Sequence, residues 1–292
     1  MMAQPLIGVS PAYFISRFSD RFSAKQVAQG LEGVAAMGFG SFQPEVFHRE
    51  ALSKWQQSGA ALVAERSEAL GLRATQFVAH FLLNAFSAPQ YMGTDTTRED
   101  MQIVLDIVKH FNGCRIITVP LGAFEPDHNN TAGDARKHSQ RLRDTIGRLA
   151  EMTAATGIRL ALEIMPGAVI GGIDGYMRLC NNLGPDAPGL NFDTGHAWVA
   201  GEDVLRIPER VGKQILGTHL CDNFGQENLS LRPGAGSIAW PQLIRALATA
   251  GYDGAWDMEI ICPPERCREE YERARDFITP HLQSATAGIP AP

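Results

Sequence analysis

Short apolar runs alternate with longer segments of mixed polarity along the whole chain. The apolar runs lie at residues 6–10, 40–46, 72–79, 114–120, 158–164, 190–194, 215–220 and 255–260. Near-continuous apolar runs of this length are typical of strands buried on both faces, as in a parallel sheet. Between them, apolar residues recur at spacings of three and four, most clearly over 23–38 and 138–157, which predicts amphipathic helices. The chain therefore reduces to a series of strand–helix units.

Glycines mark the ends of the predicted helices. They stand just before the next apolar run at Gly38, Gly71, Gly113, Gly157 and Gly251. Glycine tolerates the left-handed conformation that commonly ends a helix, so these positions support the predicted boundaries. Strict alternation of strands and helices implies a parallel sheet. Eight units in 292 residues fit an α/β protein with a closed (β/α)₈ TIM barrel better than an open doubly wound sheet.

The composition is that of an ordinary soluble protein, with 45% hydrophobic and 20% charged residues. No Pro- or Ser-rich linker divides the chain. We expect a single domain over residues 1–292, with a frayed tail over about 283–292. The net charge of −6 disfavours nucleic acid as a partner, because phosphate binding usually leaves a basic surface.

Three further absences bear on where the protein works. No apolar run approaches the roughly 20 residues needed to span a bilayer. The first residues show neither a basic region nor a long apolar stretch typical of a secretory signal. The five cysteines are scattered and contain no CxxC pair, so neither a disulfide framework nor a zinc knuckle is indicated. A cytoplasmic protein without a membrane partner is expected.

Polar residues that can bind metals end the last four predicted strands. They are Glu163 in "LALEIMP", Asp193 in "LNFDTGH", His219 in "LGTHLCDN" and Glu259 in "AWDMEI". A buried charge must be paired, protonated or bound to a metal. One such residue alone is more often a helix cap or an ion-pair partner. Four on consecutive strands converge on one mouth of a barrel, which favours a shared ion.

Three carboxylates and one imidazole suit a hard or borderline divalent cation. We expect one ion, with Mn²⁺ preferred and Mg²⁺, Co²⁺ or Zn²⁺ as alternatives.

The strand ends carry a resemblance to a known superfamily. The segments "ALEIMPG", "NFDTGHAWVAGED", "GTHLCDN" and "LRPGAGSIAWPQLIRALATAGYDGAWDMEI" resemble xylose isomerase-like barrels, which include sugar phosphate isomerases and epimerases and endonuclease IV-type proteins. The resemblance extends from Leu6 to about Leu282. It implies that Glu163, Asp193, His219 and Glu259 bind one divalent cation and that His196 contacts substrate or supports a ligand. It also implies a homo-oligomer, without fixing its size.

The endonuclease branch is disfavoured. Its members use three zinc ions, and one pair of ligands comes from a D-x-H just before the PGxG segment. Asn228 and Ser230 stand there in this chain, and neither is a good ligand for a tightly held zinc ion. A non-enzymatic binding barrel would require the four strand-end residues to be incidental.

The mononuclear branch acts mostly on carbonyl sugars and polyols, which suggests a reaction. A cation that chelates a ketone oxygen and the neighbouring hydroxyl stabilises an enediolate, so that a carboxylate can remove the adjacent proton. The hypothesis is an isomerase or epimerase that acts on a keto sugar or polyol, with Glu163 and Glu259 as the acid/base pair. A lyase with the same enolisation, inosose dehydratase-like or 3-oxo-glycoside-cleaving, is the alternative, and the sequence separates the two poorly.

Four other residues are candidates for substrate contact: His196, His80, Glu45 and Arg232. Glu45 ends the second predicted strand, where hydrogen bonds to sugar hydroxyls and a structural salt bridge are equally compatible with the pattern. His80 ends the third. Arg232 precedes the "PGAG" turn and either contacts an anionic group or points to solvent. Asp222 either orients a ligand or forms an Asp-Asn turn.

Overall fold

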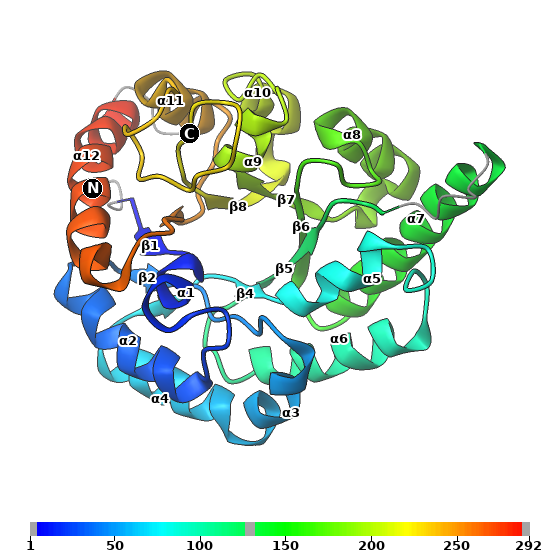
Figure 1. The fold of residues 1–292 in the computed structure, drawn as a ribbon, viewed down its shortest axis with the longest axis horizontal. Coiled ribbons are helices and arrows are strands. Elements are labelled where there is room, and N and C mark those ends of the chain that lie inside the picture. Colours follow the sequence, from blue (N-terminus) through cyan, green and yellow to red (C-terminus); the bar gives the residue numbers. More distant parts are fainter. Residues whose placement is uncertain (1–4, 126–131, 288–292) are drawn as a thin grey trace.

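The computed structural model, described here for residues 5–125 and 132–287, has a ring of strands enclosed by helices (Figure 1). The strands are β1 Ile7–Val9, β2 Ser41–Phe42, β3 Arg73–Ala74, β4 Phe77–Val78, β5 Ile116–Leu121, β6 Arg159–Ile164, β7 Gly189–Asp193, β8 Ile215–His219 and β9 Trp256–Met258. The α-helices are α1 Ala12–Phe18, α2 Ala24–Ala36, α3 Leu52–Lys54, α4 Ala60–Ala69, α5 Leu83–Ser87, α6 Asp95–Val108, α7 Ala132–Ala154, α8 Gly172–Leu183, α9 Thr194–Val199, α10 Ile207–Val211, α11 Trp240–Thr249 and α12 Cys267–Ala287.

Shorter helical turns lie between these elements. The 3₁₀ turns are η1 Arg49–Ala51, η3 His80–Leu82, η4 Gly184–Asp186, η5 Gly212–Gln214 and η6 Pro264–Arg266, and η2 Trp55–Gly59 is a π-helical turn. Within the described residues, no helix combines the length and the apolar character needed to cross a membrane.

The ring closes through two parallel sheets. Their strand orders are β3-β2-β1-β9 and β4-β5-β6-β7-β8. Parallel bridges between Glu45 and Val78 and between Leu220 and Met258 join one sheet to the other. β3 and β4 are two parts of one barrel strand, which pairs first with β2 and then with β5. The predicted (β/α)₈ barrel is therefore confirmed, with its third strand divided in two.

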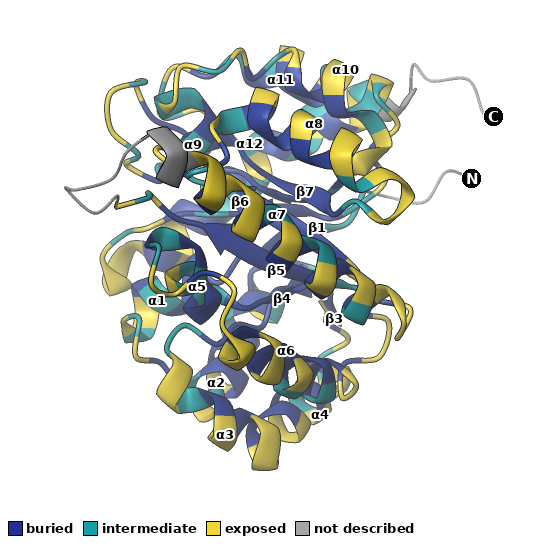
Figure 2. Cartoon of the chain, turned by 90° about the vertical axis from the view of Figure 1, so that its right-hand side faces the viewer, coloured by how far each residue is buried: buried dark blue, intermediate teal, exposed yellow. Residues whose placement is uncertain are grey.

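Burial explains why the strand sequences are apolar throughout. The strands are buried almost entirely, whereas the surrounding helices expose their outer faces (Figure 2). The helix α2 shows how a local sequence fixes such an element: Ser23 and Gln26 form a reciprocal capping box at its start. It ends before Gly38, whose φ is +78°. Gly71, Gly157 and Gly251 also have positive φ and closely follow the ends of α4, α7 and α11, so those boundaries are confirmed. Gly113 has positive φ as well, but α6 already ends at Val108, so that predicted boundary is wrong.

Two further predicted boundaries are wrong. The second strand was expected over 40–46 but is regular only over Ser41–Phe42, followed closely by Pro44, which has no N–H to donate. The frayed tail was expected from about residue 283, but α12 continues to Ala287, because Leu282 is buried and Ala285 packs against the core. Residues 288–292 of the predicted tail lie outside the described residues.

Candidate metal centre

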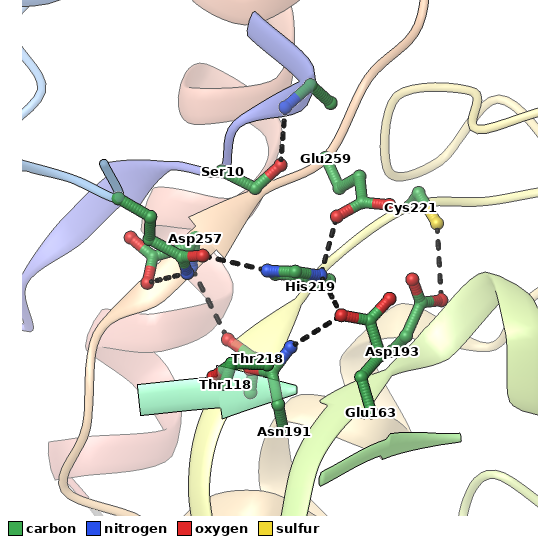
Figure 3. Close-up of polar contacts among 12 residues, drawn as sticks. Ser10, Thr118, Glu163, Asn191, Asp193, Thr218, His219, Cys221, Asp257 and Glu259 are labelled. Atoms are coloured by element: carbon green, nitrogen blue, oxygen red, sulfur yellow. Dashed lines mark hydrogen bonds and ion pairs between the residues drawn. The ribbon is translucent and has the colours of Figure 1, made fainter. Parts of the chain in front are cut away.

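Four metal-binding side chains meet at the carboxyl ends of the last barrel strands. Glu163 lies in β6, Asp193 ends β7, His219 ends β8 and Glu259 follows β9. One ligand atom from each lies within 4.8 Å of all the others. Asp193 and His219 are neighbours in the β7–β8 pairing, which explains their proximity. Figure 3 shows His219 between the carboxylates of Glu163 and Glu259. The structure thus brings together the set predicted from sequence.

The electrostatics of the cluster centre on His219. Its Nδ1 lies 2.7 Å from Glu259 Oε2 and 3.2 Å from Glu163 Oε2. Burial works to lower the pKa of His219, but Glu259 and Glu163 outweigh it and raise the pKa well above its usual range. Burial works to raise the pKa of Glu163, but His219 outweighs it and the pKa is lowered. The pocket therefore strongly favours positive charge among its carboxylates.

Two buried polar atoms in this cluster lack a partner in hydrogen-bond geometry within the described structure: Asp193 Oδ2 and His219 Nδ1. Asp193 Oδ1, in contrast, accepts a 2.7 Å hydrogen bond from the backbone N–H of His196 and so caps α9. Burial is the main cause of the raised pKa of Asp193, with a further contribution from Glu259. A divalent cation would give Asp193 Oδ2 a partner and would neutralise the carboxylates that crowd His219 Nδ1, so these residues fit an oxygen-rich metal site.

His196 lies beside the four candidate ligands. Its Nε2 is 3.7 Å from both Glu163 Oε1 and Asp193 Oδ2. Its Nδ1 is 3.1 Å from Asn228 Nδ2, and Asn228 Oδ1 accepts from the backbone N–H of Ser230. The amide therefore directs its NH₂ at His196, and the remaining ring nitrogen faces the carboxylates as a donor.

Glu45 approaches the same cluster from the second strand. It is 2% exposed, and its Oε2 is a second buried oxygen, after Asp193 Oδ2, without a hydrogen-bond partner in the described structure. Burial, followed by the charges of Glu259 and Glu163, raises the pKa of Glu45 well above its usual range. These causes favour the protonated carboxyl group, which can donate to a substrate oxygen.

A family model described as xylose isomerase-like TIM barrel matches residues 31–281. The chain belongs to the xylose isomerase-like TIM barrel family. Among curated proteins, it is 27% identical over 154 residues to an inosose dehydratase of Geobacillus thermodenitrificans, covering 46% of this chain and 52% of that protein. The chain spans between 25% and 55% of the length of the curated relatives it matches.

Solved structures share the fold of this xylose isomerase-like barrel. A D-tagatose 3-epimerase-like protein superposes with a TM-score of 0.74 at 18% identity, covering 97% of this chain and 99% of that one. The IOLI protein with a bound zinc atom superposes with a TM-score of 0.69 at 16% identity, covering 96% of each chain. At such identities these similarities establish the fold.

In this xylose isomerase-like barrel, Arg232 and Asp222 are engaged in contacts between loops and helices. Arg232 Nε lies 3.3 Å from Glu270 Oε2, so its charge is paired with α12. Asp222 is fully buried and accepts hydrogen bonds from three backbone N–H groups and from Trp240 Nε1 at 2.7 Å. Asp222 therefore organises the loop between β8 and α11, in line with the structural alternative.

The sequence interpretation missed the buried amides beneath the cluster. The side chains of Gln43, Gln76 and Asn191 are at most 1% exposed. Asn191 Nδ2 donates to Glu163 Oε2 at 3.4 Å (Figure 3). Gln76 Nε2 donates to Asn191 Oδ1, and Thr118 Oγ1 donates to Gln76 Oε1. Each of these amides is a polar residue inside a predicted apolar strand, and that feature could have identified it. The prediction of site residues considered only charged residues and histidine at such positions.

His80, also in the barrel mouth, stacks on Phe47 with ring centroids 3.8 Å apart. Burial is the main cause that lowers its pKa from 6.5 to about 4. As pH falls below 6.5, the unfolded chain binds a proton that the folded state resists. His80 should therefore contribute a loss of native stability as pH falls from about 6.5 to 4.

Replacing His80 with Gln should flatten the dependence of the unfolding free energy on pH over that window. Urea denaturation at a series of pH values measures this slope. His110→Gln, a change at an exposed histidine, provides the control and should leave the slope as it is. Equal slopes for all three proteins would contradict the assignment to His80.

Proposed function

We propose that this protein is a metal-dependent enzyme that transfers a proton at the carbon next to the carbonyl of a keto sugar or polyol, as an isomerase or epimerase. The observation that carries the proposal is the four-residue cluster, in which the buried Asp193 Oδ2 has no hydrogen-bond partner in the described structure. A bound cation supplies polarisation of the carbonyl and neutralises developing negative charge. Mn²⁺ is our first choice, and the zinc named for one structural neighbour keeps Zn²⁺ as the alternative.

Two carboxylates are placed to move the proton. Glu163 and Glu259 flank His219 through their Oε2 atoms. Glu163 is buried, and its lowered pKa favours the ionised form that a base requires. Glu259 keeps 15% of its side chain exposed, so it can exchange protons with solvent and substrate at the mouth. In this proposal Glu163 and Glu259 act as the acid/base pair, while Asp193 and His219 serve mainly as ligands.

The neighbouring side chains suit a polyhydroxylated substrate. Glu45 offers a buried carboxyl group that favours its protonated form, and His196 directs a ring N–H toward the cluster. His80, whose lowered pKa keeps it neutral, has both a donor and an acceptor nitrogen. We assign these three to hydroxyl recognition. Arg232 was predicted alongside them, but its pairing with Glu270 favours a structural role.

A lyase is the second candidate, favoured by the names of the curated relatives. Inosose dehydratases match this chain at 26–27% identity over 154 to 170 residues. The first step would be the same proton removal by a carboxylate. Loss of hydroxide from the β carbon, as water after protonation, would then replace reprotonation. The nature of the product distinguishes the two.

Hydrogen exchange tests the shared step. We expect purified, metal-loaded protein to incorporate deuterium from D₂O next to the carbonyl of at least one member of a panel of ketohexoses, ketopentoses and inososes. Chelation should abolish exchange and added Mn²⁺ should restore it. NMR of the products separates an epimer or isomer from a dehydrated ketone. Exchange that persists in metal-free protein, or that no member of the panel shows, would contradict the proposal.

A further inference from the structure

Beneath His219, a buried glutamine connects the imidazole to another carboxylate in the barrel interior. Gln43, just after β2, is 0% exposed. Its Oε1 lies 2.8 Å from His219 Nε2, and its Nε2 donates to Asp257 Oδ2 at 2.8 Å. The opposite nitrogen of the ring, Nδ1, faces Glu163 and Glu259, as Figure 3 shows.

Donor and acceptor chemistry fixes the direction of this hydrogen-bond chain. The Asp257 carboxylate also lies within reach of the hydroxyls of Ser41 and Thr75, which donate to it at 3.4 and 3.3 Å. An ionised carboxylate only accepts, so Gln43 must turn its NH₂ toward Asp257 and its carbonyl oxygen toward His219. That oxygen also only accepts, so His219 Nε2 must carry a hydrogen. Whenever the ring is neutral, as binding a cation through a ring nitrogen requires, its lone pair is then on Nδ1.

The surrounding backbone preserves room for this arrangement. A Cβ added at Gly8 would lie 2.0 Å from Asp257 Oδ1 and 2.1 Å from Ser41 Oγ. Any larger residue at position 8 would therefore displace the carboxylate that orients Gln43. The absence of a side chain at Gly8 is thus a condition of the Asp257–Gln43 contact.

We infer that Gln43 is a positioning residue that selects the His219 tautomer whose Nδ1 lone pair receives the cation. The choice of ligand atom rests on the proposed metal-dependent function. Gln43 acts through His219 and contacts neither substrate nor metal, and Asp257 acts one step further by orienting the amide. Ligand histidines generally need such a partner on the second nitrogen, and its loss typically costs about 10–100-fold in metal affinity.

The principal variant is Gln43→Met, which keeps the volume of the side chain and removes both hydrogen bonds. Competition with a chromogenic chelator should show about 10–100-fold weaker Zn²⁺ binding. Nitrogen-15 NMR of labelled histidine, at a pH where the ring is neutral, should show that His219 no longer keeps its hydrogen exclusively on Nε2. Retention of both wild-type affinity and wild-type tautomer would overturn the inference.

Two further variants separate tautomer selection from a general loss of packing. Gln76→Met removes an equally buried amide whose hydrogen bonds go to Asn191 and Thr118 and not to His219 Nε2, so the tautomer should stay as in wild type. In the double variant Gln43→Glu with Asp257→Asn, the acidic group is moved next to His219. The new carboxylate accepts from Nε2–H, while the new amide donates to it. Unlike Gln43→Met, the double variant should keep the wild-type tautomer and bind Zn²⁺ within about threefold of wild-type affinity. A double variant without the wild-type tautomer would count against the inference.

The same measurements distinguish this inference from the proposed function. Wild-type protein that binds no divalent cation would overturn the metal-dependent function. The tautomer of His219 in metal-free protein, measured at a pH where the ring is neutral, would still decide the role of Gln43. Conversely, wild-type protein that binds Zn²⁺ with an affinity unaffected by Gln43→Met would overturn only the positioning role.

Discussion

Replacing either Glu163 or Glu259 by Gln should lower the rate of deuterium exchange into substrate by roughly 10³–10⁴-fold. A positioned base contributes about 10²–10⁴-fold, and each change also weakens the cation site. An amide oxygen still coordinates, so metal loading at saturating Mn²⁺ should survive in both variants. Single-turnover exchange rates, measured alongside the metal content of the same samples, separate lost proton transfer from lost metal.

Glu202→Gln provides a matched control for these two changes. Glu202 is a partly buried carboxylate whose Oε1 accepts from the backbone N–H of Ile173, and an amide oxygen can keep that bond. Its exchange rate should remain within about twofold of wild type, since no part of the four-residue cluster is altered. If both Glu163→Gln and Glu259→Gln retained full turnover, the acid/base assignment would be wrong.

Changing Asp193 to Asn should move stability in opposite directions with and without metal. Burial raises the pKa of Asp193, which means that the folded protein tolerates its charge less well than the unfolded chain does. The neutral amide should therefore stabilise metal-free protein by about 1 kcal/mol or more. Metal affinity should fall by at least roughly 100-fold, because a ligand is lost rather than an outer partner.

Urea unfolding with and without Mn²⁺ measures both halves of this prediction. At 1,000 times the dissociation constant, a ligand adds about 4 kcal/mol to stability, so wild type should gain far more than the variant at the same ion concentration. The Asn side chain can still cap α9 through its oxygen, which limits unrelated damage. Asp203→Asn, at an exposed residue that bonds only locally, should behave as wild type in both conditions. If Mn²⁺ increased the unfolding free energy of Asp193→Asn as much as that of wild type, Asp193 would not be a metal ligand.

Sequence patterns predicted the barrel well where a local physical rule decides the structure. The glycines that end helices, such as Gly38 and Gly157, were recognisable because the left-handed conformation strongly favours glycine. The division of the third strand at Thr75 and Gln76 was not predictable, since it arises when one strand changes partners from β2 to β5. The length of α12 likewise depends on burial of Leu282 by the folded core.

The same distinction applies to the candidate site: residues recognisable by a local rule were predicted, and contacts made between distant segments were not. Glu163 and Asp193 could be located because a charge inside an apolar strand needs an explanation wherever it occurs. The pairing of Arg232 with Glu270 links a loop to a distant helix, and no spacing in the sequence predicts such a contact. Gln43 was recognisable in the sequence, because "SFQPEV" places an amide in a predicted strand. Its partners, His219 and Asp257, are visible only in three dimensions.

The amides under the cluster bear on any attempt to transplant this centre into another barrel scaffold. Copying the four strand-end residues would reproduce the proposed metal ligands but not the buried amides beneath them. Gln43 follows β2, Gln76 lies between β3 and β4, and Asn191 lies in β7. Position 8 must remain glycine for Asp257 to fit. In a barrel without these residues, the four transferred side chains would not be held in place and their protonation states would not be fixed. The smallest set of residues that must be transferred together therefore comes from most of the circumference of the barrel.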